Sequence, residues 1–434
     1  MITRDVILVV VREQYAQKIE SIGKDRLDRA LSNTLPQPVP EFVRIVTGIR
    51  RCGKSTLMQE YIHHYFPGAF YLNFDDPRLY GFTAENFSLL DEVITLWQKE
   101  KQGSTSLFFD EIQSVDGWEV YVRQKLESGV FVTVTGSNAT LLSSELGTRL
   151  TGRHLDSELF PFSFTEYCAY YKLPGDESSV AKYMKDGGFP EYLRYRDEEI
   201  LSRLFDDILT RDVAIRYGVR DERALKILSL YLATNCGNLI TAGKLSAQFL
   251  IKSTATVLEY LSHLANSYLF YYVPKFSWSQ KVQAVNPRKV YCIDTGLVNA
   301  VSTTATRNEG HLFENMVFMQ LRREQYVIFY YADEASECDF IFGKKESPEF
   351  ALQVCLHLDE ENRAREVAGV VHAVQAVPSL KPCIVTLNQN DVIQDEGIRI
   401  PVISAVEFFT HGIAAIEQNT MRPSAELVRE DRER

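Results

Sequence analysis

Short apolar runs alternate with polar and helical stretches through the first third of the chain. Four of these runs, at residues 42–46, 69–75, 107–109 and 130–135, consist mainly of aliphatic and aromatic residues and have the length of buried strands. Residues 55–62 instead read as the first turns of a helix. Strands that alternate with helices are typical of an α/β domain. The pattern therefore predicts an α/β fold for this region.

The pattern changes after residue 162. From 163 to 217, tyrosine and leucine recur at three- and four-residue steps, which predicts helices. Three helical stretches and a ribbon of two alternating runs follow, at 224–236, 241–249, 254–267, 268–276 and 288–293. This order of helix, turn, helix and ribbon is typical of a winged helix.

The last third has a third pattern, which is helix, three strands, helix and two strands. These segments lie at 311–323, 327–331, 337–342, 350–355, 361–376, 383–386 and 398–403. The order matches the α/β core of restriction-endonuclease-like domains. The charged residues that end the chain are expected to be disordered.

The loop between the first strand and the first helix has the spacing of a phosphate-binding P-loop. Its glycines allow a tight turn whose N–H groups point at phosphates, and the following helix dipole adds positive potential. Lys54 is expected to reach the β- and γ-phosphates, and the Ser55 hydroxyl to ligate Mg²⁺. The predicted nucleotide site is the whole loop, Gly48, Ile49, Arg50, Arg51, Cys52, Gly53, Lys54, Ser55 and Thr56.

Two acids end the strand at 107–109. Asp110 can hold Mg²⁺ directly or through water, and Glu111 is suited to polarise an attacking water, which favours hydrolysis over transfer. Asn138, after the strand at 130–135, is the sensor candidate. The strand at 69–75 is predicted to separate the P-loop strand from the acidic strand, as in the ATPase branch of P-loop proteins.

Two arginines follow the sensor strand. Arg149 and Arg153 suit stabilisation of transition-state charge, in their own subunit or across an interface of a homo-oligomer. The alternative is that both are ordinary surface arginines, which are solvated or ion-paired.

The composition bounds the class of protein. With 434 residues, 45% hydrophobic and 24% charged, the chain is too long for one compact core. A net charge of −11 argues against a surface that coats nucleic acid, while a local basic patch stays compatible with it. The apolar run at 6–11 is far shorter than the ~20 residues of a membrane span, so we expect a cytoplasmic protein without membrane attachment.

The seven cysteines are scattered and contain no C-x-x-C pair, which indicates reduced thiols and no disulfide framework or zinc site. Cys52 lies near a helix N-terminus inside the P-loop. A lowered thiol pKa there is one hypothesis, and a small residue tolerated in the loop is the other.

Several motifs spread along the chain carry a family resemblance. The specific ones are the P-loop and Phe109-Asp-Glu-Ile-Gln113 with Trp118 after it. The others are Gly136-Ser-Asn138, Leu150-Thr-Gly-Arg153, Pro161-Phe-Ser-Phe-Thr-Glu166, Gly187-Gly-Phe-Pro-Glu191 and Lys289-Val-Tyr-Cys-Ile-Asp-Thr-Gly296. By these motifs the chain resembles bacterial and archaeal AAA+-type predicted ATPases with a C-terminal restriction-endonuclease-like domain of unknown function. The resemblance implies an ATPase core, a helical lid, a winged-helix segment and a nuclease-like fold, and leaves the biological role undefined.

Nucleases of the last fold bind Mg²⁺ through acids on the second and third strands and carry a lysine two residues after the second acid. Asp339 fits the first place, and Glu314 on the preceding helix is a further acid. Gln353 and Cys355 stand where the second acid and the lysine belong. We therefore expect a degenerate site, with Glu314, Asp339 and Gln353 as its residual residues.

The predicted wing carries four cations, whereas the third helix of the winged helix offers few groups for phosphate or guanine. The candidate DNA contacts are Lys275, Lys281, Arg288 and Lys289. A purely structural module is the alternative.

The predicted organisation has six parts. They are an N-terminal helical segment (1–40), a P-loop AAA+-like ATPase core (41–162), a helical lid (163–220), a winged-helix-like segment (221–294), a degenerate restriction-endonuclease-like domain (295–415) and a charged tail (416–434). The expected function is Mg²⁺-dependent ATP binding and hydrolysis that rearranges C-terminal modules which bind double-stranded DNA or an unidentified protein. Two alternatives stay open, an ATP-gated metal-dependent DNA nuclease and a non-hydrolysing nucleotide-dependent DNA-binding or scaffold protein. A P-loop contacts the phosphates and not the base, so the sequence does not decide whether the nucleotide is ATP or GTP.

Overall fold

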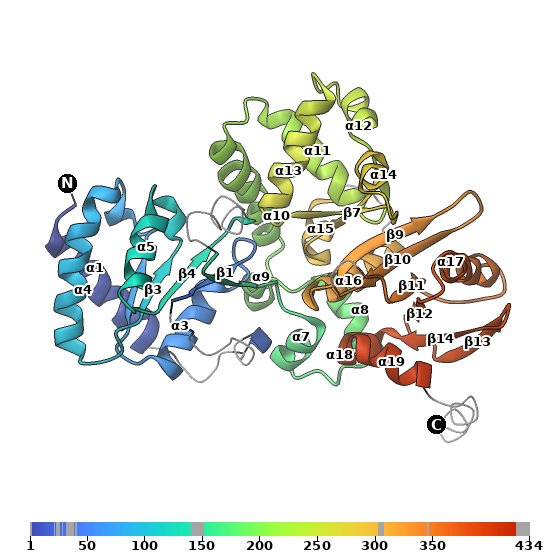
Figure 1. Cartoon of the computed structure of the whole chain (residues 1–434), viewed down its shortest axis with the longest axis horizontal. Coiled ribbons are helices and arrows are strands. Elements are labelled where there is room, and N and C mark those ends of the chain that lie inside the picture. The colour runs from blue at the N-terminus through green and yellow to red at the C-terminus, as the bar shows by residue number, and fades with distance from the viewer. Residues whose placement is uncertain are drawn as a thin grey trace. The chain divides into compact units, whose positions relative to one another are not determined.

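The chain folds into two compact units, Met1–Phe160 with Asn266–Tyr268 and the remainder of the chain. The computed structural model describes residues 2–20, 22, 27, 29–31, 39, 41–139, 152–302, 308–344 and 347–421 (Figure 1). Within these residues no helix is both long and apolar enough to cross a membrane.

A five-stranded parallel sheet forms the centre of the first unit (Figure 1). Its strands are β1 Val43–Thr47, β2 Phe70–Asn73, β3 Leu107–Asp110, β4 Val132–Gly136 and β5 His154–Glu158, in the order β2-β3-β4-β1-β5. The strand that separates β1 from β3 is therefore β4, and β2 lies at the edge. The prediction that the strand at 69–75 takes the separating position is wrong, because chain order does not fix the order of strands in a parallel sheet.

Helices cover this sheet. They are α1 Arg4–Tyr15, which continues as the π-helical turn Ala16–Glu20, α3 Lys54–Tyr65, α4 Phe87–Lys101 and α5 Trp118–Glu127, with short 3₁₀ turns at Pro77–Leu79, Ala84–Asn86 and Ile112–Ser114. Thr3 caps α1 by accepting a hydrogen bond from the Val6 N–H at 3.3 Å. Ile7, Val10 and Val11 on α1 are fully buried in the same core as the aromatic residues of β2 and β3. The N-terminal helix is thus part of the core of this unit.

Five consecutive helical segments begin the second unit, and a later helix packs against two of them. They are α7 Phe164–Tyr171, α8 Glu177–Asp186, α9 Pro190–Tyr195, α10 Glu199–Asp207, the π-helical segment Ile208–Ile215 and, later in the chain, α15 Thr295–Val301. Ser163 and Glu166 form a capping box that starts α7. The prediction of helices from 163 to 217 is confirmed.

Three helices and a small antiparallel sheet come next. They are α11 Glu222–Thr234, β6 Leu239–Ile240, α12 Ala242–Gln248, α13 Thr254–Asn266, β7 Phe270–Pro274 and β8 Arg288–Cys292, and the strand order is β6-β8-β7. The predicted helices and ribbon are all present. The loop between β7 and β8 also contains α14 Gln280–Val285, a short helix that the polar composition of this loop did not indicate.

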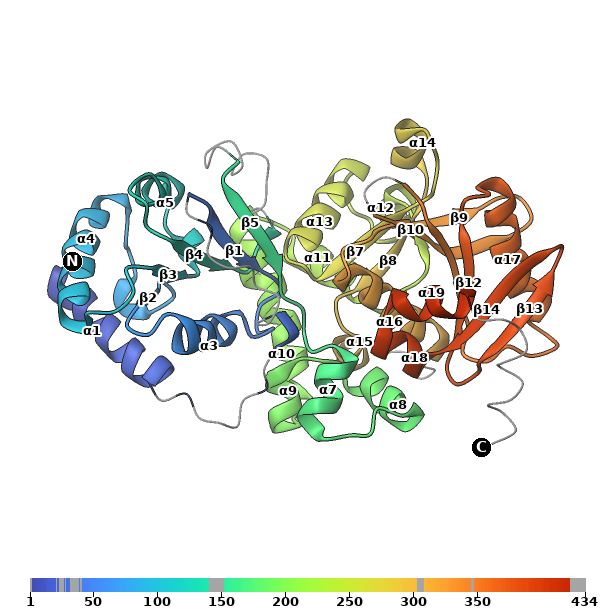
Figure 2. The ribbon, with the colours of Figure 1, turned by 60° about the horizontal axis from the view of Figure 1, so that its bottom comes forward.

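A six-stranded mixed sheet ends the second unit (Figure 2). Its strands are β9 Val327–Ala332, β10 Glu337–Gly343, β11 Phe350–Val354, β12 Lys381–Thr386, β13 Asp391–Asp395 and β14 Ile398–Ser404, in the order β13-β14-β12-β11-β10-β9. The accompanying helices are α16 Glu309–Arg323, α17 Arg363–Ala376, α18 Ala405–His411 and α19 Ile413–Met421.

Most of this order agrees with the predicted pattern. The sequence pattern missed β13, whose polar residues resemble a loop, and it began the tail too early, because α19 reaches Met421. α18 and α19 pack beside β14 (Figure 2).

Candidate functional site

The P-loop connects β1 to α3 in the first unit. Gly48 has φ 144° and Gly53 has φ 105°, backbone values that residues with a side chain rarely adopt. A Cβ atom on Gly48 would also lie 2.1 Å from the Leu159 carbonyl oxygen. The sequence therefore needs glycine at both positions, for conformation and, at Gly48, for space.

The Lys54 ammonium lies across this loop at the start of α3. It donates to the carbonyl oxygens of Gly48 and Ile49, each at 3.0 Å, and it is 3.9 Å from Glu111 Oε1. Lys54 is buried, Ser55 is half-buried and Thr56 is exposed. Lys54 is thus held close to the carboxylate of Glu111 at the first turn of the helix.

Asp110 ends β3 and is completely buried. Its Oδ2 accepts hydrogen bonds from the Tyr71 hydroxyl at 2.9 Å and from Asn73 Nδ2 at 3.0 Å, and its Oδ1 accepts from Thr135 Oγ1. Burial and the charge of Asp110 raise the pKa of Tyr71 well above its ordinary value, so the hydroxyl stays a donor. Side chains from β2 and β4 therefore fix the Asp110 carboxylate in one orientation.

Glu111 has a left-handed backbone, with φ 55°, and its N–H donates to Thr135 Oγ1 at 3.2 Å. Its Oε2 accepts hydrogen bonds from Gln113 Nε2 and from Ser137 Oγ, the latter at 3.4 Å. Burial raises the pKa of Glu111, and the positive charge of Lys54 partly opposes this rise. A raised pKa strengthens a carboxylate as a base toward water. Strained backbone of this kind is common at functional sites.

Two residues join this site that sequence reasoning did not assign. Arg29 is buried, and its guanidinium donates to the carbonyl oxygens of Cys52 at 2.9 Å and Phe160 at 2.7 Å. Gln113 holds Glu111, while its own Oε1 is buried without a hydrogen-bond partner. Gln113 lies in the motif Phe109–Gln113, so the sequence contained a signal for it. Arg29 lies in no motif and precedes β1 by more than ten residues.

The other predicted residues have varied surroundings. Asn138 is buried just after β4, next to Ser137. Arg153 is exposed just before β5, while Arg149 lies outside the described residues. Burial raises the pKa of the Cys52 thiol, which donates to the Leu159 carbonyl at 3.3 Å. The hypothesis of a lowered Cys52 pKa is therefore wrong, because desolvation outweighs the nearby positive charges.

Within the loop, Arg51 is exposed with a φ of 63°, and Arg50 is half-buried.

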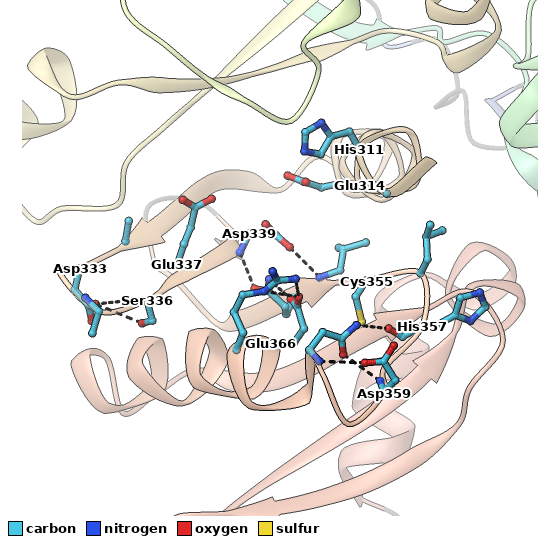
Figure 3. A pocket seen from close by; sticks show the side chains of 18 of the residues that line it. His311, Glu314, Asp333, Ser336, Glu337, Asp339, Cys355, His357, Asp359 and Glu366 are labelled. Carbon is cyan, nitrogen blue, oxygen red and sulfur yellow. Dashed lines mark hydrogen bonds and ion pairs between the residues drawn. The ribbon is translucent and has the colours of Figure 1, made fainter. Parts of the chain in front are cut away.

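The second unit contains a cavity of about 780 Å³ between α16, β10, β11 and α17 (Figure 3). Glu314, Asp339 and Gln353, the residues of the predicted residual nuclease-like site, all line it. In Figure 3, Glu314 and His311 lie on one side of Asp339, and Glu366 lies on the other. Among the described residues, no group of three His, Cys, Asp or Glu side chains is arranged to hold a metal ion.

The wing cations differ from one another. Lys281 and Arg288 are exposed, and Lys275 is half-buried. Lys289 is only 2% exposed, and its ammonium contacts buried carboxylates beside the cavity. The prediction of Lys289 as a DNA contact is wrong, because its side chain is buried and its ammonium is paired with Glu314 and Asp339.

Two family models match the chain. One, described as an AAA domain, covers residues 41–168, and the other, a domain of unknown function (DUF8612), covers residues 177–308. The uncharacterized protein MJ1544 of Methanocaldococcus jannaschii is 33% identical over 362 residues, which are 78% of this chain and 80% of that protein. An uncharacterized protein of Haemophilus influenzae is 29% identical over 381 residues, 83% of this chain and 92% of that protein.

Solved structures show only remote similarity. A signal-transduction ATPase with numerous domains and a tetratricopeptide repeat sensor, from Pyrococcus horikoshii, has 14% identity and a TM-score of 0.26, over 70% of this chain and 46% of that chain. The ORC1 protein of Aeropyrum pernix in complex with DNA has 11% identity and a TM-score of 0.27, over 69% of this chain and 91% of that chain. At these TM-scores neither likeness carries an argument about this chain.

Proposed function

We propose that this protein binds ATP with Mg²⁺ and hydrolyses the ATP. The premise is that the chain belongs to the same family as the uncharacterized Methanocaldococcus jannaschii protein and that its first unit contains an AAA-type P-loop ATPase domain. The observation that carries the proposal is the approach of Lys54 Nζ to Glu111 Oε1, at 3.9 Å, beside the buried Asp110. A phosphate-binding cation and a candidate base thus meet at one end of the sheet. This is the arrangement that hydrolysis of a terminal phosphate needs.

The residues of the loop fit the triphosphate and its metal ion. The positive φ values of Gly48 and Gly53 suit a tight turn around phosphates, and Lys54 is placed to neutralise their charge. Ser55 and the fixed carboxylate of Asp110 would hold Mg²⁺, which neutralises charge on the phosphates when bound. Glu111 would accept the proton of the attacking water, with Gln113 and Ser137 holding its second oxygen.

We further propose that hydrolysis changes how the second unit engages a partner. The order of three helices and the sheet β6-β8-β7 supports a winged-helix module, and the mixed sheet with α16 and α17 supports a degenerate restriction-endonuclease-like module. The helices from α7 to α10 are proposed as the lid of the ATPase.

Steady-state phosphate release from ATP with Mg²⁺ tests this function. The wild-type protein is expected to turn over, and Lys54→Ala to lose both nucleotide binding and turnover, because the loop then lacks the ammonium that lies beside Glu111. Phosphate release that survives Lys54→Ala would place the activity elsewhere or in a contaminant. Repeating the assay with GTP decides the base preference.

A specific observation favours double-stranded DNA as the partner. Residues 269–293, the hairpin of β7 and β8, contain four cations and no acid in a chain of net charge −11. Lys281 and Arg288 are exposed there, and Trp278, which lies between Lys275 and Lys281 in sequence, is 75% exposed. Basic residues beside an exposed aromatic ring suit contact with phosphates and bases.

Neutralising Lys275, Lys281 and Arg288 to glutamine is expected to lower duplex DNA affinity and to flatten its salt dependence. The matched control neutralises three exposed cations elsewhere in the same unit, Lys182, Lys185 and Arg203. Equal losses in the two triple variants, or none in either, would remove the hairpin as the contact.

A further inference from the structure

A buried lysine lies at the centre of three carboxylates in the second unit. Lys289 comes from β8, Glu314 from α16, and Glu337 and Asp339 from β10. The Lys289 ammonium is 2.8 Å from Asp339 Oδ1, 2.8 Å from Glu337 Oε1 and 3.1 Å from Glu314 Oε1. Two structural elements, α16 and β10, thus direct three acids at one cation, and that cation is a side chain of β8.

Both carboxylate oxygens of Asp339 have a hydrogen-bonding partner in the protein. Its Oδ1 meets Lys289, and its Oδ2 accepts a hydrogen bond from the Val354 N–H at 3.0 Å. Asp339 is largely buried. A divalent ion would therefore have to compete with the Lys289 ammonium and the Val354 N–H for the residue that the nuclease fold uses as its first ligand.

Both ends of the Gln353 side-chain amide are also hydrogen-bonded to protein groups. Its Oε1 accepts the Asp339 N–H at 3.1 Å, and its Nε2 donates to Glu366 Oε2 at 2.7 Å. The amide is therefore turned toward protein groups on both sides. Gln353 forms a link between β10, β11 and α17, and its oxygen is already occupied as an acceptor.

Glu314 is held by two donors on the same oxygen. Its Oε1 accepts from the Tyr291 hydroxyl at 2.6 Å and from Lys289 at 3.1 Å. Tyr291 and Lys289 both lie on β8, so the strand supplies the charge and the hydrogen bond together. The residues that the nuclease fold implies as a metal site thus do not fit a metal ion.

We propose that the Lys289 ammonium takes the place of a divalent cation in this cluster, so that the cavity of the second unit works without a metal ion and does not cut nucleic acid. The three carboxylates compensate the charge of the buried ammonium. A second cation at these carboxylates would lie close to the first and be repelled by it. The inference goes beyond ATP hydrolysis and does not depend on it.

The same lysine has a rival role, as the displaced catalytic lysine of a working metal nuclease. Both roles place Lys289 beside Asp339. They differ in what the wild-type protein does with a metal ion and in what removal of the ammonium does.

Mn²⁺ binding to the full chain without nucleotide, followed by electron paramagnetic resonance, tests the proposal. The wild-type protein and Asp339→Asn are expected to take up the same amount of Mn²⁺, because the cluster takes none. Lys289→Met is expected to bind Mn²⁺ at least about tenfold more tightly, because three carboxylates lose their cation. The double variant Lys289→Met, Asp339→Asn is expected to lose that gain.

Three results would overturn the proposal. The first is wild-type Mn²⁺ binding that falls with Asp339→Asn. The second is Mn²⁺-dependent cleavage of DNA by the wild type that is lost in Asp339→Asn. The third is a folded Lys289→Met variant that gains no Mn²⁺. If Lys289→Met does not fold, the comparison of wild type with Asp339→Asn still decides, since it uses the intact cluster.

Discussion

Arg29 connects the P-loop to the end of the first unit. Its guanidinium binds the carbonyl oxygens of Cys52, inside the loop, and Phe160, the last residue of that unit before the chain enters the second. The Cys52 thiol makes a parallel link to Leu159. Residues 1–40 lie outside the stretch matched as an AAA domain, yet they supply this contact. The P-loop is therefore held in part by a side chain outside its sequence motif.

Arg29→Ala is expected to weaken ATP binding by roughly tenfold, because a buried charged donor to two carbonyl oxygens is lost and the loop loses support. Titration with a fluorescent ATP analogue measures this. Arg123→Ala, a half-exposed arginine of α5, is the matched control and is expected to bind as the wild type does. Equal affinity of Arg29→Ala and wild type would show that the loop holds its shape without this contact.

At the level of elements, a buried asparagine on α16 bonds to the backbone of β8. Asn315 is completely buried, donates to the Cys292 carbonyl oxygen at 2.9 Å and accepts from the Cys292 N–H at 2.8 Å. It pairs with the strand as a neighbouring strand would. The helix that carries Glu314 is thereby set against the strand that carries Lys289.

Asn315→Ala is expected to lower the free energy of unfolding of the second unit by roughly 2 to 4 kcal/mol, because a buried N–H and a buried C=O lose their partners. Denaturant unfolding measures this change. Asn299→Ala, a more exposed asparagine of α15, is expected to cost less. Equal losses would mean that the backbone groups of Cys292 find new partners.

The same pair of elements makes the second unit sensitive to pH. Burial, and then the charge of Asp339, raise the pKa of Glu314 to about 7 from its ordinary 4.5. The folded state therefore binds the proton more tightly than the unfolded chain. The free energy of unfolding is expected to fall as pH rises from about 4.5 to about 7, by at most about 1.4 kcal/mol per pH unit.

Calorimetry across that range checks the slope. Glu314→Gln is expected to flatten it, whereas Glu309→Gln, an exposed acid at the start of α16, is expected to leave it in place. Stability that rises with pH in the wild type would contradict the assigned cause.

At the scale of the whole molecule, the sequence predicted what is local and periodic. The P-loop, the acids after β3 and the helices from 163 onward follow from spacing and hydrophobic pattern. The place of β4 between β1 and β3, and the inward position of Lys289, depend on packing between segments that are distant in the chain. Arg29 was not predicted for the same reason. Its partners are backbone carbonyl oxygens, which every residue has, so no residue type in the sequence indicates them.

The central claim is that Glu111 activates water at the P-loop, and parallel measurement of ATP affinity and phosphate release in Glu111→Gln tests it most directly. Glutamine keeps the shape of the side chain and removes its basicity. The expected result is a dissociation constant for ATP within about twofold of wild type and phosphate release lower by at least about 100-fold. Phosphate release by Glu111→Gln at the wild-type rate, or a wild type that binds ATP and releases no phosphate, would contradict the account.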